Sequence, residues 1–197
     1  MWNHNTHFHS YLLRQLPATS HHALDVGCGL GDFAKVLAKQ VKVVDALDGD
    51  QVIISEARKR NNMPNINYLQ ADFLQADLSP NSYDVIVAIA SLHHINLEAA
   101  LPKMKLLLRP SGKLLILGLY RETTIIDYFY SLISIPLNWI YRYWHQTLTV
   151  ATAITPPTHP ANLSFHPIKS VAFNLLPGCS LRRHLLWRYS LIWQKPN

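Results

Sequence analysis

Three glycines at alternate positions follow a carboxylate near the start of the chain. Asp25 stands two residues before Gly27, and Gly29 and Gly31 continue the pattern. Glycines at a turn between a strand and a helix let the backbone approach a ligand that a Cβ would exclude. The helix after such a turn begins with unpaired N–H groups that point at the same place. The spacing therefore predicts a turn that holds a nucleoside-type cofactor.

The glycine spacing also distinguishes between cofactors. A dinucleotide-binding turn reads G-x-G-x-x-G and holds a pyrophosphate over the helix N-terminus, whereas this chain reads G-x-G-x-G. A carboxylate at Asp25 suits a cationic or amine-bearing ligand and would repel a pyrophosphate. Cys28, inside the turn, is expected to be a small filler and not a nucleophile. The alternative is a glycine turn that binds no ligand.

A second carboxylate is expected about twenty residues farther along, where it would accept hydrogen bonds from the ribose hydroxyls. Asp48 fits, nineteen residues after Gly29, with Gly49 beside it. A plain helix cap is the alternative for Asp48. Strand alternation places its rival Asp45 inside the strand, away from the ligand, and Asp50 is expected to cap the following helix.

Short apolar runs alternate with helical patterns through the first 119 residues. Strands are expected at 23–26, 41–47, 66–69, 84–90 and 113–119, and helices at 33–39, 51–60 and 97–108. This rhythm predicts an α/β fold: a Rossmann-like, doubly wound, mostly parallel sheet whose ligands bind at the carboxyl ends of the strands. Partial alternation over 180–195 predicts a closing antiparallel strand pair, which makes seven strands.

The order of these motifs resembles the class I S-adenosylmethionine (SAM)-dependent methyltransferases. Asp25-x-Gly27-x-Gly29-x-Gly31 resembles their motif I. Leu-His-His at 92–94, after the fourth strand, resembles the small-molecule branch, which includes quinone-biosynthesis methyltransferases. Residues 106–114 resemble the family's turn from a helix into the fifth strand. The resemblance covers about half of the chain and implies SAM as cofactor and a small, apolar or aromatic methyl acceptor.

The resemblance also implies a set of cofactor-binding residues. In that family an Asp after the third strand accepts from the adenine amino group, with an apolar neighbour against the ring, and Asp72 and Phe73 match this pattern. A turn aspartate is the alternative for Asp72. The full set is Asp25, Gly27, Cys28, Gly29, Gly31, Asp48, Gly49, Asp72, Phe73 and Ala90.

The candidate catalytic residues are histidines and a tyrosine. A general base is needed only if the acceptor arrives protonated. The candidates are His93 and His94, of which one is expected to face the cleft while the other packs, and His9 and Tyr11 in the histidine-rich N-terminal segment 1–20. This segment is interpreted as a lid over the cleft or as a solvated terminus. His4 and His7 would share a helix face there, but nearby acidic or cysteine ligands are lacking, so no metal site is expected.

The aromatic-rich segment 123–145 is long enough to span a bilayer. Asp127, Pro136 and Arg142 interrupt it, which argues against a span. One interpretation is a pair of amphipathic core helices kinked at Pro136. Another is a substrate-side cap whose aromatic wall receives an apolar acceptor or touches a membrane surface, and a third is a partner interface. A proline-rich stretch follows at 155–160.

The length of 197 residues suits a single domain. Its expected parts are a cap or lid (1–20), a SAM-binding core (21–120), a substrate-side segment (121–175) and a closing strand pair (176–197). Two distant cysteines and no secretory signal point to the cytoplasm. The scattered formal charge of +6 predicts no specific nucleic-acid partner. The alternatives are a nicotinamide-dependent oxidoreductase, a nucleic-acid methyltransferase and a non-catalytic binding protein on this fold; the oligomeric state is left open.

Overall fold

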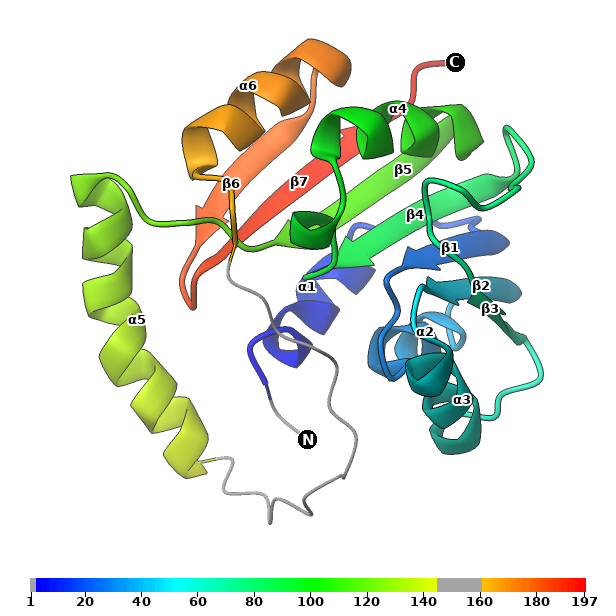
Figure 1. Cartoon of the computed structure of the whole chain (residues 1–197), viewed down its shortest axis with the longest axis horizontal. Helices are drawn as coiled ribbons and strands as arrows, with labels where there is room; N and C mark the ends of the chain where they lie inside the picture. Colours follow the sequence, from blue (N-terminus) through cyan, green and yellow to red (C-terminus); the bar gives the residue numbers. More distant parts are fainter. Residues whose placement is uncertain (1–2, 145–160) are drawn as a thin grey trace.

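A computed structural model describes residues 3–144 and 161–197, and a single mixed sheet organises them (Figure 1). The strand order is β3-β2-β1-β4-β5-β7-β6, with neighbours parallel from β3 to β5 and antiparallel from β5 to β6. The strands are β1 His22–Val26, β2 Val43–Asp48, β3 Ile66–Gln70, β4 Tyr83–Ile89, β5 Leu108–Gly118, β6 Ser180–His184 and β7 Arg188–Gln194. The predicted seven-stranded, Rossmann-like fold with its closing antiparallel pair is confirmed.

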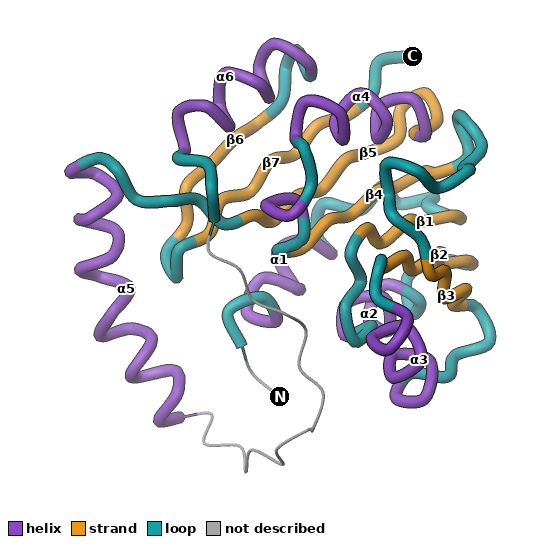
Figure 2. The backbone as a smooth tube through the Cα atoms, in the orientation of Figure 1, coloured by secondary structure: helices purple, strands orange, loops and turns teal. Residues whose placement is uncertain are grey.

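Helices cover both faces of the sheet (Figure 2). Leu101 of α4 and Ile168 of α6 belong to one apolar cluster, whereas Leu12 of α1, Leu37 of α2 and Ile54 of α3 belong to the other. The helical elements are η1 Thr6–Phe8, α1 His9–Leu13, α2 Asp32–Leu37, α3 Gln51–Arg60, η2 Leu92–His94, α4 Leu97–Leu107, α5 Ile125–Trp144 and α6 Phe165–Leu175. The sheet is thus the central layer, and its apolar strands are buried on both sides.

The fifth strand begins earlier than the apolar run suggests. We expected it to start at residue 113, but β5 starts at Leu108, opposite Tyr83 of β4. The register then shifts, and the next pair is Val85 with Lys113. Ser111, between these two pairs, has a φ of +61°. The start of β5 is therefore an irregular stretch of strand, which the spacing of apolar residues does not reveal.

The aromatic-rich segment forms one helix, α5, whose first turn lies near β6 and whose next turns contact the loop between β6 and β7 (Figure 1). The interpretation as a pair of core helices is wrong, because most large apolar side chains of α5 point away from the protein; Ile125, for example, is 89% exposed. No helix within residues 3–144 and 161–197 is long and apolar enough to cross a membrane. The proline-rich stretch 155–160 lies outside the described residues.

Candidate functional site

The glycine turn connects β1 to α2, and its backbone requires glycine. Gly27 and Gly31 have φ values of +70° and +78°. A Cβ on Gly27 would lie 2.3 Å from the Cβ of Ser91, and one on Gly31 would lie 2.6 Å from the hydroxyl of Tyr68. Because real Cβ atoms do not approach so closely, both positions combine a left-handed backbone with a close neighbour.

The turn is fastened to the end of β2. The backbone N–H groups of Gly27 and Cys28 donate to the Leu47 carbonyl over 2.8 and 2.9 Å, and the Gly29 N–H donates to Asp48 Oδ2 over 3.0 Å. These hydrogen bonds therefore join the loop after β1 to the carboxyl end of β2. Cys28 is buried, and burial raises the pKa of its thiol, which suits a filler and not a nucleophile.

Asp25 lies beneath the turn and is 1% exposed. It accepts a hydrogen bond from the backbone N–H of Ala34 in the first turn of α2, while its Oδ2 has no hydrogen-bond partner among the described residues. Burial, and secondly the charge of Asp48, raises the pKa of Asp25 from 3.8 to about 7. A buried carboxylate oxygen without a partner is costly. A cationic donor brought by a ligand would satisfy it.

Asp48 ends β2 and faces the glycine turn. Its Oδ1 accepts from the Asp50 N–H over 3.0 Å, so each carboxylate oxygen has one donor and keeps one lone pair. A ribose diol could donate to both. Gly49, beside it, is exposed, and a Cβ at this position would meet no atom within 4 Å, so packing does not dictate its lack of a side chain.

The other two acids near β2 have the expected structural roles. Asp45 lies within the strand and accepts hydrogen bonds from His22, Asn67 and Tyr83 over 2.8 to 2.9 Å. Asp50 accepts from the backbone N–H groups at the start of α3, as a helix cap does. Both predictions are confirmed, which leaves Asp48 as the acid of β2 that is available at its carboxyl end.

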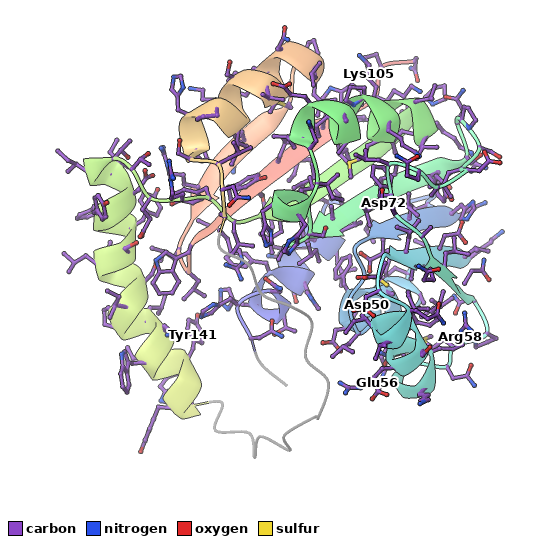
Figure 3. The ribbon with its side chains drawn as sticks, viewed as in Figure 1. Asp50, Glu56, Arg58, Asp72, Lys105 and Tyr141 are labelled. Carbon is purple, nitrogen blue, oxygen red and sulfur yellow. The ribbon has the colours of Figure 1, made fainter. Side chains whose placement is uncertain are left out.

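Asp72 and Phe73 follow β3. Asp72 is exposed, and its Oδ1 accepts from the N–H groups of Leu74 and Gln75 over 2.7 and 3.3 Å, so it does cap a turn (Figure 3). Phe73 is buried in the cluster below α4, with the Lys103 ammonium 5.4 Å from its ring centre. The adenine contacts of both residues stay predictions.

Ala90 follows β4 directly and has a left-handed conformation, with a φ of +50°. Its N–H donates to the Leu117 carbonyl over 2.7 Å. The next residue, Ser91, donates from its hydroxyl to the Val26 carbonyl over 2.6 Å and fills the space that Gly27 leaves open. Ser91 was not among the predicted site residues. A small polar residue directly after a buried strand is the signal that could have indicated it.

A cavity of about 450 Å³ begins one residue after Ser91. It lies between η2, the start of α4, the end of β5 and the start of α6. Its lining is Leu92, His93, His94, Ile95, Asn96, Leu97, Glu98, Leu119, Asn162, Leu163, Pro167, Ile168, Val171 and Tyr189. The expectation that only one histidine of the pair faces the cleft is wrong: both line this cavity, with ring centres 3.9 Å apart. The two histidines are consecutive residues of η2.

The N-terminal segment contacts α2, just after the glycine turn, through His9. Its ring packs edge-on against Phe33 in the first turn of α2, with centres 4.9 Å apart, and burial lowers its pKa. Tyr11 turns toward the closing strands, where its hydroxyl lies 3.2 Å from the Ser190 hydroxyl. Neither side chain lines the His93–His94 cavity, so the structure brings only His93 and His94 together there.

The same segment also reaches α5. His4 Nε2 lies 2.9 Å from Asn138 Oδ1, and the ring of His7 packs against Tyr141, which Figure 3 labels on α5. The guanidinium of Arg188 donates two hydrogen bonds to Asn5 Oδ1. In the part of the chain that the structure describes, no three His, Cys, Asp or Glu side chains gather as metal ligands.

Comparisons with known proteins agree with this geometry. The family profile described as a methyltransferase domain matches residues 24–116, from β1 to β5. The chain is 30% identical to the uncharacterized methyltransferase Rv0089 of Mycobacterium tuberculosis, over 99% of this chain and 98% of that protein. It is 29% identical to a ubiquinone biosynthesis O-methyltransferase of Coxiella burnetii, over 53% of this chain and 46% of that protein.

Solved structures share the fold. The N-methyltransferase NodS of Bradyrhizobium japonicum, solved with S-adenosyl-L-homocysteine, superposes with a TM-score of 0.66 and 18% identity, over 98% of this chain and 87% of that one. The YcgJ protein of Bacillus subtilis gives a TM-score of 0.67 at 15% identity, over 90% and 71%. Sequence similarity along nearly the whole chain, the methyltransferase profile and the strand order together place this protein in the class I SAM-dependent methyltransferases.

Proposed function

We propose that the chain binds SAM at the glycine turn and methylates a small, apolar or aromatic acceptor held in the His93–His94 cavity. The observation that carries this proposal is the proximity of two features. Ser91 touches the glycine turn at Gly27, and the cavity opens one residue farther along the same segment. An acceptor in that cavity would therefore lie beside the cofactor turn, which is what methyl transfer requires.

The residues of the turn fit the chemical groups of SAM. The unpartnered Oδ2 of Asp25 suits the cationic methionine end, and the two oxygens of Asp48 suit a ribose diol. Asp72 would accept from the adenine amino group. When bound, SAM supplies a methyl group that its sulfonium has already activated. The protein then has to orient the acceptor and exclude water.

The cavity wall indicates the acceptor. Most of its lining is aliphatic, including Leu92, Ile95 and Ile168, and a space of about 450 Å³ suits a molecule of one or two rings. The polar side chains of the lining are those of His93, His94, Asn96, Glu98, Asn162 and Tyr189, and the ring centres of the two histidines lie 3.9 Å apart. A largely apolar ring or chain that carries a few polar groups matches this lining, and the similarity to a ubiquinone biosynthesis O-methyltransferase supports a hydroxyl among them.

The histidine pair can hold the proton that the acceptor loses. A hydroxyl that becomes a methyl ether releases one proton, and an imidazole with a pKa near neutrality is suited to accept it. We assign this role to the pair. Both cysteines are free thiols, which supports a reducing compartment such as the cytoplasm as the place of action.

Calorimetric titration of the purified chain tests the cofactor. We expect SAM and S-adenosylhomocysteine to bind and NAD to give no heat of binding; binding of NAD without either SAM compound would refute the proposal. A panel of phenols, catechols and amines, followed by the release of S-adenosylhomocysteine, then tests the acceptor. His93→Gln and His94→Gln should each bind the cofactor normally. At least one should lose about tenfold or more in turnover and the acidic limb of the pH profile.

A further inference from the structure

The seven residues on the protein-facing side of α5 are mostly polar. This inner stripe is Asp127, Tyr130, Ser131, Ser134, Leu137, Asn138 and Tyr141, and each member is buried or half-buried. The spacing of three and four residues is that of one helix face. A helix on the surface of a water-soluble domain normally turns its apolar face inward. α5 is inverted, since only Leu137 of this stripe is aliphatic.

Specific hydrogen bonds fix this inverted orientation. Asp127 accepts from Arg183 of β6 over 3.0 Å and is fully buried. Farther along the helix, the Ser131 hydroxyl accepts from the Trp187 indole over 2.9 Å, and the Ser134 hydroxyl accepts from the Leu186 N–H over 2.8 Å. These contacts follow one another along α5, so rotation of the helix would break all of them.

The outward face of α5 is apolar and exposed. Of the fifteen large apolar side chains that the described residues leave exposed, eleven lie on α5: Ile125, Ile126, Tyr128, Phe129, Leu132, Ile133, Ile135, Trp139, Ile140, Tyr143 and Trp144. The helix has 20 residues and is about 30 Å long. An exposed apolar face of this size marks a site of contact with another apolar surface.

We propose that the outward face of α5 inserts into the surface of an anionic lipid bilayer, with the helix axis in the membrane plane. Aliphatic side chains alternate on this face with tyrosine and tryptophan, whose rings favour the boundary between headgroups and acyl chains. No described helix is long and apolar enough to cross the bilayer, which favours an in-plane position.

The charge distribution favours a lipid surface with negative headgroups. The one acidic residue of α5, Asp127, is buried against Arg183, so the outward face presents no carboxylate. The chain as a whole carries a formal charge of +6, and of the two charged residues just before the helix Arg121 is exposed whereas Glu122 is half-buried. Anionic headgroups would attract this molecule while the apolar face inserts. This proposal is independent of the cofactor and the acceptor.

Vesicle sedimentation tests the proposal with the full chain. We expect it to sediment with vesicles of phosphatidylcholine that contain about one third phosphatidylglycerol, and less with phosphatidylcholine vesicles. Lipids brominated in their acyl chains should quench its tryptophan fluorescence. The double variant Leu132→Ser/Trp139→Ser removes two outward side chains that are 68% and 73% exposed. It should keep the melting temperature and bind anionic vesicles about tenfold more weakly.

The matched control is the double variant Val52→Ser/Leu106→Ser, which removes two exposed apolar side chains from α3 and α4. It should bind vesicles like the natural chain. An equal loss of vesicle binding in both double variants would overturn the proposal. The proposal would also be overturned if the natural chain stayed in the supernatant. Light scattering tests whether a second copy of the chain covers the outward face of α5 instead. The proposal would also be overturned if the natural chain were a dimer that does not bind vesicles and if the α5 double variant were a monomer.

Discussion

Asp25 is an acid whose folded surroundings oppose its charge. Its pKa rises from 3.8 to about 7, chiefly because it is buried and also because Asp48 is near. Between these two values the folded chain holds a proton that the unfolded chain has released. The contribution of Asp25 to the free energy of unfolding therefore falls as the pH rises from about 4 to about 7, and the full cost is present above 7.

Asp25→Asn should remove this cost while keeping an acceptor for the Ala34 N–H. At pH 8 we expect the free energy of unfolding to rise by about 1 kcal/mol. We expect the affinity for S-adenosylhomocysteine to fall about tenfold. Thermal melts and calorimetry measure the two effects. Asp32→Asn, an exposed carboxylate at the other end of the turn, should change neither. A variant that binds the ligand normally would remove Asp25 from the site.

Gly27→Ala should destabilise the chain, because the new methyl group meets Ser91 at 2.3 Å and the backbone has a φ of +70°. We expect a loss of about 2–4 kcal/mol in the free energy of unfolding, measured by urea denaturation. Gly49→Ala is the control, since nothing lies within 4 Å of its Cβ position. Its free energy of unfolding should lie within about 0.5 kcal/mol of that of the natural chain. Equal effects would show that the turn does not need glycine at 27.

At the scale of elements, the spacing of apolar residues and the turn residues between apolar runs predict the sheet well and α5 poorly. β1, β2, β3 and β4 lie within two residues of the predicted runs at each end, because buried parallel strands are short apolar runs between turns. For α5 the same period of apolar residues predicts an amphipathic helix but not which face turns inward. Partners far along the chain, Arg183 and Trp187, decide that orientation, and no local pattern contains them.

The buried ion pair of Asp127 with Arg183 holds the first turn of α5 to β6. Arg183 also lies over the ring of Phe165, 3.8 Å from its centre. Asp127→Ala leaves a guanidinium without its carboxylate and removes the acceptor for the Thr124 hydroxyl and N–H. We expect a loss of about 3 kcal/mol in the free energy of unfolding or local opening.

Hydrogen exchange of the α5 amides measures this change, and it should rise there first. Glu56→Ala breaks the pair with Arg60 on α3, whose side chains are both partly solvated. That variant should cost about 0.5 kcal/mol or less. If both substitutions gave the same small effect, the Asp127 pair would not fasten α5.

At the scale of the whole molecule, the glycine turn was predictable and the His93–His94 cavity was not. The residues of the turn lie within 25–31 and 48, and their spacing carries the chemistry. The cavity joins η2 and α4 to β5, α6 and β7, which lie as much as 97 residues apart in sequence between Leu92 and Tyr189. The packing of α6 against α4 and the pairing of β7 with β5 bring these segments together, so composition and local spacing cannot indicate the cavity.

The stability of the whole chain should depend on pH in two opposing ways. The pKa values of Asp45, Asp84 and Asp127 are lowered by their hydrogen bonds and charge partners, and those of His9 and His184 are lowered by burial. These groups stabilise the fold above their unfolded pKa values of 3.8 and 6.5 and lose that contribution as the pH falls. The contribution of Asp25 to the free energy of unfolding has the opposite dependence, since it falls as the pH rises from about 4 to about 7.

The natural chain should therefore be most stable at a lower pH than Asp25→Asn, whose stability should still rise up to neutral pH. Urea denaturation midpoints between about pH 3 and about pH 8 give both curves. Curves of identical shape would mean that Asp25 has the same pKa in the folded chain as in the unfolded chain. Such a result would contradict the effect of burial that the structure indicates.

The unpartnered oxygen of Asp25 also has a consequence for the heat of ligand binding. A cation placed against Oδ2 would favour the ionised carboxylate, so a ligand that brings one would expel a hydrogen ion into the buffer near pH 6 to 7. The enthalpy measured in phosphate and in imidazole should then differ in proportion to the ionisation heats of these buffers. The number of hydrogen ions released by the natural chain, less the number released by Asp25→Asn, would report the charge of Asp25.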